Sequence, residues 1–132
     1  TPETGAMYPG ARPEQPAGAG RPSPAIFGLL TVFTLLDGTG DRFDRLAGET
    51  LEAVRRAEPD TLIYACHSVK SAPLQRIVYE LYRDEVAYAE HQRQPHVERF
   101  VAERQNLVLA TNVIELTVND AKVMPLPTAF RM

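Results

Sequence analysis

The sequence predicts one small α+β domain of ferredoxin-like topology, with a four-stranded antiparallel sheet and helices on one of its faces. Hydrophobic periodicity along residues 25–118 follows the order β-α-β-β-α-β, which is the split βαβ pattern. A short connection between the second and third strands predicts an antiparallel hairpin. A chain of 132 residues with 44% hydrophobic and 23% charged residues has room for one core of this kind.

The two ends of the chain differ from this domain. Residues 1–24 hold six of the eleven prolines and four of the eight glycines, so they cannot bury enough surface to offset their chain entropy. We expect a disordered or extended arm, either a linker or a segment that lies across a partner subunit with Tyr8 as its anchor. Residues 119–132 form a tail that we expect to pack on a second subunit.

The first half of the domain reads as a strand followed by a helix. Residues 26–36 are rich in β-branched and apolar side chains, which indicates a strand. The sequence Asp37-Gly38-Thr39-Gly40 predicts a turn, and Asp41 is the expected N-cap of a helix with apolar residues at helical spacing. Pro59 ends that helix, because it disfavours helical geometry at Glu58.

The second half begins with two strands, residues 61–69 and 74–82. Alternation along the third strand places Val78, Glu80 and Tyr82 on one face. If that face is buried, Glu80 needs a partner, for which Arg76 and Arg104 are the candidates.

Two helical stretches and a last strand complete the domain. Asp84 is the expected cap of a short helix, Pro95 fits the first turn of another helical stretch, and residues 107–118 form the last strand. Right-handed crossovers put the helices on one sheet face. The other face then needs cover, and we expect a homodimer that packs sheet against sheet.

Composition argues against several classes of function. The net charge is −3 and no basic stripe exists, so we expect no nucleic-acid partner. The longest apolar run, residues 26–36, is too short and too polar to span a bilayer. The single cysteine, Cys66, fits a reducing cytoplasm. No two of the three histidines have the i, i+4 spacing of a helical ligand pair, so we expect no metal site.

Three stretches carry a resemblance to a known family. They are EPDTLIY at residues 58–64, YELY at residues 79–82 and AYAEHQRQPHVERF at residues 87–100, of which the last contains His91, Pro95, His96 and Phe100. Together they resemble the antibiotic biosynthesis monooxygenase superfamily of dimeric α/β-barrel proteins, over about residues 26–118.

This resemblance implies a homodimer with one pocket per subunit between sheet and helices. It also implies oxidation of quinol-like or anthrone-like polyketide substrates by molecular oxygen, with no cofactor. The chain departs from the family at two positions. Tyr82 stands where many relatives have Trp, and Val101 stands where the haem-degrading branch has an axial His, which argues against haem degradation.

Cofactor-free oxygenation needs a base and donors for the oxyanion that forms. His91 is the candidate base, because an imidazole titrates near working pH and this one lies beside the predicted pocket. Tyr82 is the candidate for pocket lining and oxyanion donation. The candidate substrate-binding residues are Tyr64, Arg83, Asn112 and Phe100.

Structural roles compete with each of these assignments. His91 also fits a C-cap histidine, His96 an exposed or interfacial one, and the tyrosines an aromatic core. The leading hypothesis is a cofactor-independent monooxygenase. The alternatives are a non-catalytic dimeric module that binds a small ligand or scaffolds an assembly, and a cofactor-free isomerase or cyclase.

Overall fold

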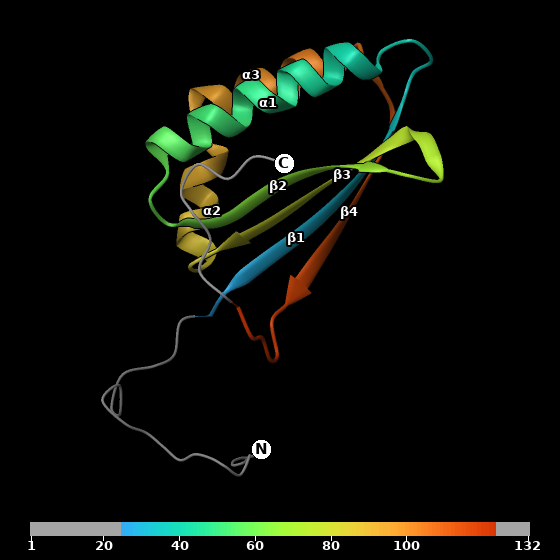
Figure 1. Ribbon diagram of the computed structural model, residues 1–132. Helices are drawn as coiled ribbons and strands as arrows, with labels where there is room; N and C mark the ends of the chain where they lie inside the picture. The colour runs from blue at the N-terminus through green and yellow to red at the C-terminus, as the bar shows by residue number, and fades with distance from the viewer. Residues whose placement is uncertain (1–24, 124–132) are drawn as a thin grey trace, which may run out of the picture.

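The computed structural model describes residues 25–123 and has seven regular elements (Figure 1). Their order is β-α-β-β-α-α-β, so two consecutive helices occupy the second crossover. The elements are β1 (Phe27–Leu35), α1 (Gly40–Ala57), β2 (Thr61–Val69), β3 (Ala72–Tyr82), α2 (Glu85–Gln92), α3 (Pro95–Arg104) and β4 (Val108–Thr117). The expected arm at residues 1–24, and the part of the expected tail from residue 124 onward, lie outside the described residues.

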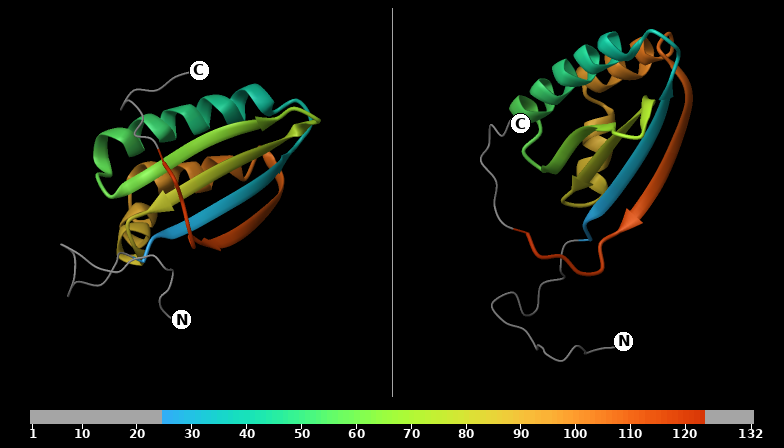
Figure 2. Two further views of the ribbon diagram at one scale, coloured as in Figure 1. Left: turned by 60° about the horizontal axis from the view of Figure 1, so that its bottom comes forward. Right: turned by 45° about the vertical axis from the view of Figure 1, so that its right-hand side comes forward.

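The sheet has the strand order β2-β3-β1-β4, and every neighbouring pair is antiparallel. The two central strands, β1 and β3, are not consecutive in the chain, because α1 and β2 intervene. All three helices lie on one side of the sheet (Figure 2). The ferredoxin-like α+β fold predicted from the sequence is therefore confirmed.

The turn and the cap before α1 follow local chemistry, with one correction. Gly38 adopts a φ of 79°, as the predicted turn requires. The N-cap is Thr39 rather than Asp41, because the helix begins at Gly40, two residues earlier than an Asp41 cap would place it. The Thr39 hydroxyl lies 2.7 Å from the Leu36 carbonyl and 2.9 Å from the Leu107 carbonyl, so it ties the turn to the start of β4.

The caps predicted for the second helical region are confirmed. The Asp84 carboxylate accepts a hydrogen bond from the Ala87 amide at 2.8 Å, which satisfies one of the free N–H groups at the start of α2. Pro95 occupies the first turn of α3, where its missing N–H costs nothing. The junction of α2 and α3 is therefore fixed by sequence-local signals.

The core lies between the sheet and helices α1 and α3. The rings of Phe33, Phe43 and Phe100 form a mutual cluster with centroid separations of 5.1 to 6.0 Å. Aliphatic side chains from α1 and the strands fill the space around the three rings, among them Leu46 and Val78. This packing fixes α1 and α3 against the centre of the sheet.

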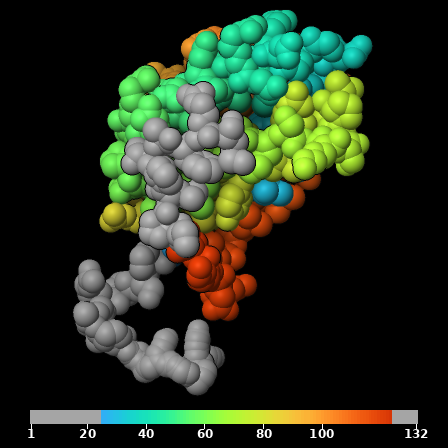
Figure 3. Space-filling view, in the orientation of Figure 1, coloured from blue at the N-terminus to red at the C-terminus, as the bar shows by residue number. Residues whose placement is uncertain are grey.

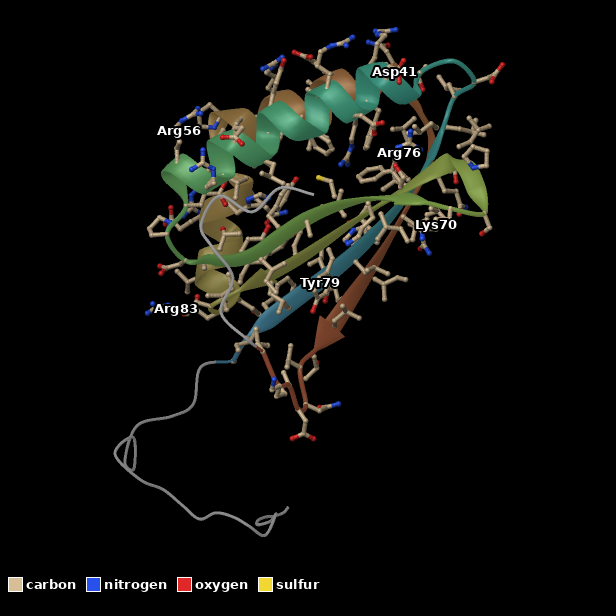
Figure 4. The ribbon with its side chains drawn as sticks, in the orientation of Figure 1. Asp41, Arg56, Lys70, Arg76, Tyr79 and Arg83 are labelled. Atoms are coloured by element: carbon tan, nitrogen blue, oxygen red, sulfur yellow. The ribbon has the colours of Figure 1, made fainter. Side chains whose placement is uncertain are left out.

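No helix formed by residues 25–123 covers the opposite face of the sheet. Along β1, Leu29, Thr31 and Phe33 are buried toward the helices, whereas Leu30 and Val32 point to the other face and remain partly exposed. Tyr79 shares that open face, because it pairs with Leu30 across β1 and β3 (Figure 4). In the space-filling view, β2 and β3 reach the surface beside α1 (Figure 3). Within residues 25–123, no helix has the length and apolar character needed to cross a membrane.

Candidate functional site

A buried carboxylate, Glu58, organises the site at the end of α1. It is the C-cap residue of that helix, immediately before Pro59, and its side chain is 5% exposed. Its Oε1 accepts hydrogen bonds from His91 Nδ1 and from the Thr61 hydroxyl, both at 2.7 Å, and its Oε2 accepts one from His96 Nε2 at 2.5 Å. Burial alone would raise the pKa of this carboxyl, but the three hydrogen bonds outweigh that effect and lower it.

His91 lies in the last turn of α2 and is enclosed by aromatic rings. Its ring centroid is 5.1 Å from that of Tyr82, 5.7 Å from that of Tyr64 and 6.3 Å from that of Tyr88. The imidazole side chain is 6% exposed. Its Nδ1 is bound to Glu58, while its Nε2 forms no hydrogen bond with any residue from 25 to 123. The imidazole therefore has one engaged and one free nitrogen.

The free nitrogen of His91 faces a second buried carboxyl. Glu80 Oε1 lies 3.8 Å from His91 Nε2 and accepts a hydrogen bond from the Tyr82 hydroxyl at 2.5 Å. Burial raises the pKa of Glu80, and the hydrogen bond from Tyr82 offsets this only in part. Burial and the neighbouring Glu80 also raise the pKa of Tyr82, so its hydroxyl keeps its proton. Glu80 thus accepts a hydrogen bond from Tyr82 and lies within ion-pair distance of His91, whereas Arg76, one expected partner, pairs with Asp44 at 2.7 Å.

His96 is a second histidine of the site, contrary to the expectation that it is exposed or interfacial. Its side chain is 14% exposed and its Nε2 contacts Glu58. The reason is the tight junction between α2 and α3, where Arg93 and Gln94 turn the chain so that the first turn of α3 faces the end of α1. The two histidines, five residues apart, therefore meet the same carboxylate.

The structure brings some of the predicted site residues together and separates others. Tyr82, His91 and Tyr64 share one cluster. Phe100 lies instead in the hydrophobic core, packed against other phenylalanines. Arg83 lies at the end of β3, where it points away from the domain and pairs with Asp60 at 3.3 Å (Figure 4).

Asn112 lies on the opposite side of the sheet from this cluster. It is exposed on β4 and pairs with Val32 in the sheet register, and the side chain of Val32 points to the open face. A ligand bound beside His91 on the helix side of the sheet would therefore not contact the Asn112 of the same chain.

Two residues of the site were missed by the sequence prediction. Nothing local links Glu58 to His91, which lies 33 positions further along the chain. The available signal is that an acidic residue at a helix C-terminus opposes the helix dipole, so it needs another reason to be there. The other residue is Arg104, which was considered only as a partner for Glu80.

The guanidinium of Arg104 is half-buried on aromatic rings. It lies 5.2 Å from the centroid of Phe33 and 5.4 Å from that of Phe100. Burial lowers the pKa of Arg104, while Tyr64, Glu80 and Tyr88 oppose that change electrostatically. These three neighbours belong to the site, so Arg104 lies close to it. Within residues 25–123, no carboxylate is in ion-pair contact with it. Arg104 thus presents hydrogen-bond donors beside the cluster.

A hollow of about 370 Å³ lies outside the cluster. The residues that line it come from the end of α2 and one side of α3: Gln92, Val97, Glu98, Val101, Ala102 and Gln105. No described group of three or more His, Cys, Asp or Glu side chains is arranged to hold a metal ion. Both histidines that reach Glu58 direct a ring N–H at it, so the carboxylate is already occupied by hydrogen-bond donors.

The sequence of this domain matches a known protein family. The family model described as antibiotic biosynthesis monooxygenase matches residues 26–103, which is more than half of the chain. The chain therefore belongs to the antibiotic biosynthesis monooxygenase family, as its sequence motifs predicted. No curated protein matches its sequence at a significant level.

Several solved structures have a similar fold at low sequence identity to this chain. A Pseudomonas aeruginosa protein is 22% identical with a TM-score of 0.68, and the match covers 74% of this chain and 98% of that one. A Bacteroides thetaiotaomicron protein, described as a candidate antibiotic biosynthesis monooxygenase, is 20% identical with a TM-score of 0.72 over 79% and 99% of the two chains. A Mycobacterium tuberculosis protein is 19% identical with a TM-score of 0.69 over 75% and 100%. At these identities the matches establish the fold.

Proposed function

We propose that this protein is a cofactor-independent monooxygenase that oxidises a flat, ionisable aromatic substrate of the quinol or anthrone type with molecular oxygen. The observation that carries the proposal is the state of His91. Its ring is buried among tyrosines, its Nδ1 is held by Glu58, and its Nε2 has no hydrogen-bond partner among residues 25–123. An imidazole in this arrangement is suited to accept a proton from a bound substrate.

The reaction balances without a cofactor. For an anthrone, His91 removes a proton from the reacting CH₂ carbon, and the electron pair delocalises onto the ring oxygen. The anion reduces oxygen by forming a C–O bond, and the resulting peroxide takes up a proton. Loss of the second C–H proton, together with cleavage of the O–O bond, releases water and leaves a carbonyl. Two C–H bonds and one O₂ thus become one C=O and one H₂O.

Arg104 is our proposed partner for the substrate oxyanion, in place of Tyr82. The Tyr82 hydroxyl is fully buried and already donates to Glu80, so Tyr82 is better placed to hold Glu80 than to contact substrate. The Arg104 guanidinium has no carboxylate partner among residues 25–123, and such a group can stabilise the anionic oxygen by a charge-assisted hydrogen bond. The half-buried rings of Tyr64 and Tyr88 would line the substrate.

We also propose that the protein forms a homodimer through the open sheet face. The single cysteine fits a reducing compartment, so we propose that the protein acts in the cytoplasm. Partly exposed apolar side chains on this face, such as Leu30, Val32 and Tyr79, would be covered by a second copy. Light scattering should then give a mass of twice 14.7 kDa. The substitution Val32→Glu should halve that mass, because it would bury a charge in the interface. A wild-type mass of 14.7 kDa would refute the dimer.

A non-catalytic dimeric module is the second candidate, and one observation favours it. Tyr82 is completely buried and His91 is 5% exposed, while the hollow lies along α3 and includes neither residue. A site that stays this closed would bind a ligand at the hollow or serve only as a scaffold. The monooxygenase proposal requires that half-buried Tyr88 move to admit substrate.

Oxygen uptake by metal- and flavin-free protein separates these candidates. We expect uptake with a panel of hydroquinones and anthrones to follow protein concentration and to fall at least tenfold in His91→Asn, because general base catalysis typically contributes a hundredfold or more. The matched control, Glu90→Gln on the exposed side of α2, should keep the wild-type rate. Substrate turnover without oxygen would indicate an isomerase or cyclase. Absence of any turnover across the panel would favour the non-catalytic module.

A further inference from the structure

The Glu58 carboxylate is held by donors from three different elements. His91 comes from α2, His96 from α3 and Thr61 from the start of β2. We propose that Glu58 is a positioning residue that fixes His91 in the tautomer with its proton on Nδ1 and its lone pair on Nε2, and that His96 and Thr61 hold Glu58 in place. The role of His91 as a base rests on the proposed monooxygenase function, whereas the tautomer and orientation of its ring do not.

The proton position follows from the chemistry of the pair. A carboxylate only accepts hydrogen bonds, and the lowered pKa of Glu58 keeps it ionised at neutral pH. His91 Nδ1, 2.7 Å from Oε1, must therefore carry a hydrogen. A neutral imidazole has one N–H, so Nε2 then has a free lone pair.

The competing state is an imidazolium placed between the two carboxyls. The groups that face the His91 ring are Glu58, Tyr64, Glu80, Tyr82 and Tyr88. In that state Nε2 would donate to Glu80, but the separation of 3.8 Å is too long for a hydrogen bond. The imidazolium would have one hydrogen bond for its two N–H groups and only an ion-pair contact for the second, whereas the neutral tautomer satisfies its single N–H, and the ¹⁵N spectrum distinguishes these two states.

His96 and Thr61 restrict the carboxylate itself. A glutamate side chain with one partner can rotate about its terminal bond, which would move the acceptor away from His91. Here the Thr61 hydroxyl shares Oε1 at 2.7 Å, and His96 binds the other oxygen, Oε2. The plane of the carboxylate is therefore fixed independently of His91, and the orientation of the imidazole follows from it.

This arrangement determines which nitrogen reacts. Nε2 faces the side of the site that contains Glu80 and Tyr82, so the acidic group of the substrate must approach from there. When Nε2 accepts the proton, the existing hydrogen bond to Glu58 stabilises the imidazolium, and no proton moves to Glu58. Glu58 thus acts only through His91.

The test is a ¹⁵N NMR spectrum of the histidine rings in the full-length protein, with ¹⁵N-labelled histidine at pH 7.5. We expect wild-type His91 to show a protonated Nδ1 and an unprotonated Nε2. Glu58→Leu, which removes the acceptor, should convert this pattern to a mixture of tautomers. Glu90→Gln is the matched control and should leave it unchanged. A wild-type spectrum with both ring nitrogens protonated, or with only Nε2 protonated, would overturn the inference whether or not any variant folds.

A second measurement separates positioning from simple support of the fold. His96→Gln keeps a donor for Glu58 and should preserve the His91 tautomer, whereas His96→Leu removes the donor and should broaden or mix it. An unchanged pattern in both His96→Leu and Glu58→Leu would contradict the proposal. Because the spectrum needs no substrate, its result is independent of oxygen uptake. If the spectrum shows the expected tautomer but the protein turns over no substrate, the proposed function is refuted and the positioning role of Glu58 is supported.

Discussion

Replacing Glu58 by glutamine tests how much the buried carboxylate contributes to folding. The glutamine oxygen can still accept from His91 and Thr61, but its amide group would face His96 Nε2, which is also a donor. The hydrogen bonds lose their charge assistance, and His96 must either move its proton to Nδ1 or leave two donors opposite each other. Hydrogen bonds to charged groups contribute about 1.5–3 kcal/mol each, so we expect Glu58→Gln to lower the free energy of unfolding by about 2–3 kcal/mol at pH 7.

The pH dependence of this difference follows from the lowered pKa of Glu58. A carboxyl whose pKa is lower in the folded than in the unfolded state stabilises the fold above its unfolded value of 4.5. That contribution is lost as the pH falls through the folded pKa, where Glu58 takes up a proton and becomes similar to glutamine. The stability gap between wild type and Glu58→Gln should therefore be constant near neutral pH and shrink toward zero in acid.

Urea unfolding followed by circular dichroism measures the gap at pH 7, 5 and 3.5. With a slope of about 1–3 kcal/mol per molar urea, the midpoint at pH 7 should fall by about 1 M or more. Glu90→Gln, which removes only an exposed pair with Arg93, should shift it little. A gap below about 0.5 kcal/mol at pH 7 would mean that the Glu58 hydrogen bonds contribute almost nothing. An equal gap at all three pH values would show that the effect does not arise from the ionised carboxylate.

Three further substitutions test other parts of the structure. Glu80→Gln should raise stability at pH 7 by roughly 1 kcal/mol, because burial disfavours the Glu80 anion and the glutamine oxygen can still accept from Tyr82; a fall in the urea midpoint would contradict this. Asp84→Ala removes the N-cap of α2 and should cost about 1 kcal/mol, and Asp84→Asn should restore most of it. Phe100→Ala should cost about 3–5 kcal/mol in thermal or urea unfolding, because it leaves a cavity between Phe33 and Phe43; a loss below about 1 kcal/mol would place Phe100 outside the core.

The elements could be predicted from sequence because their signals are local. Asp84 and Pro95 mark helix starts through contacts within a few residues, and alternation along β3 assigns Glu80 and Tyr82 to one face. The N-cap of α1 was the exception. Thr39 and Asp41 are both residue types found at N-caps, and the Thr39 side chain makes no capping hydrogen bond but donates to the distant Leu107 carbonyl, a contact that no local pattern encodes.

The site could be predicted only in part, because its organising residue acts over long range. Tyr82 and His91 were found from residue type and family motif, and they do lie in one cluster. The contacts of Glu58 with His91 and His96 span 33 and 38 residues, and no periodicity encodes them. Of the two partners expected for Glu80, Arg76 pairs with Asp44 instead and Arg104 acts on Glu80 only electrostatically, while the hydrogen bond comes from Tyr82; this choice depends on how the helices lie across the sheet.

The position of Glu58 argues that its charge is kept for more than stability. Its side chain is 5% exposed, and it caps the C-terminus of α1, where the helix dipole disfavours a negative charge. Buried ion pairs can often be replaced by apolar side chains without loss of stability, so folding alone does not require one here. A neutral acceptor could join the ends of α1, α2 and α3, but it would stabilise a protonated His91 far less. The ionised form is the one that suits a histidine which gains and loses a proton during a reaction, and this links the charge of Glu58 to the proposed role of His91.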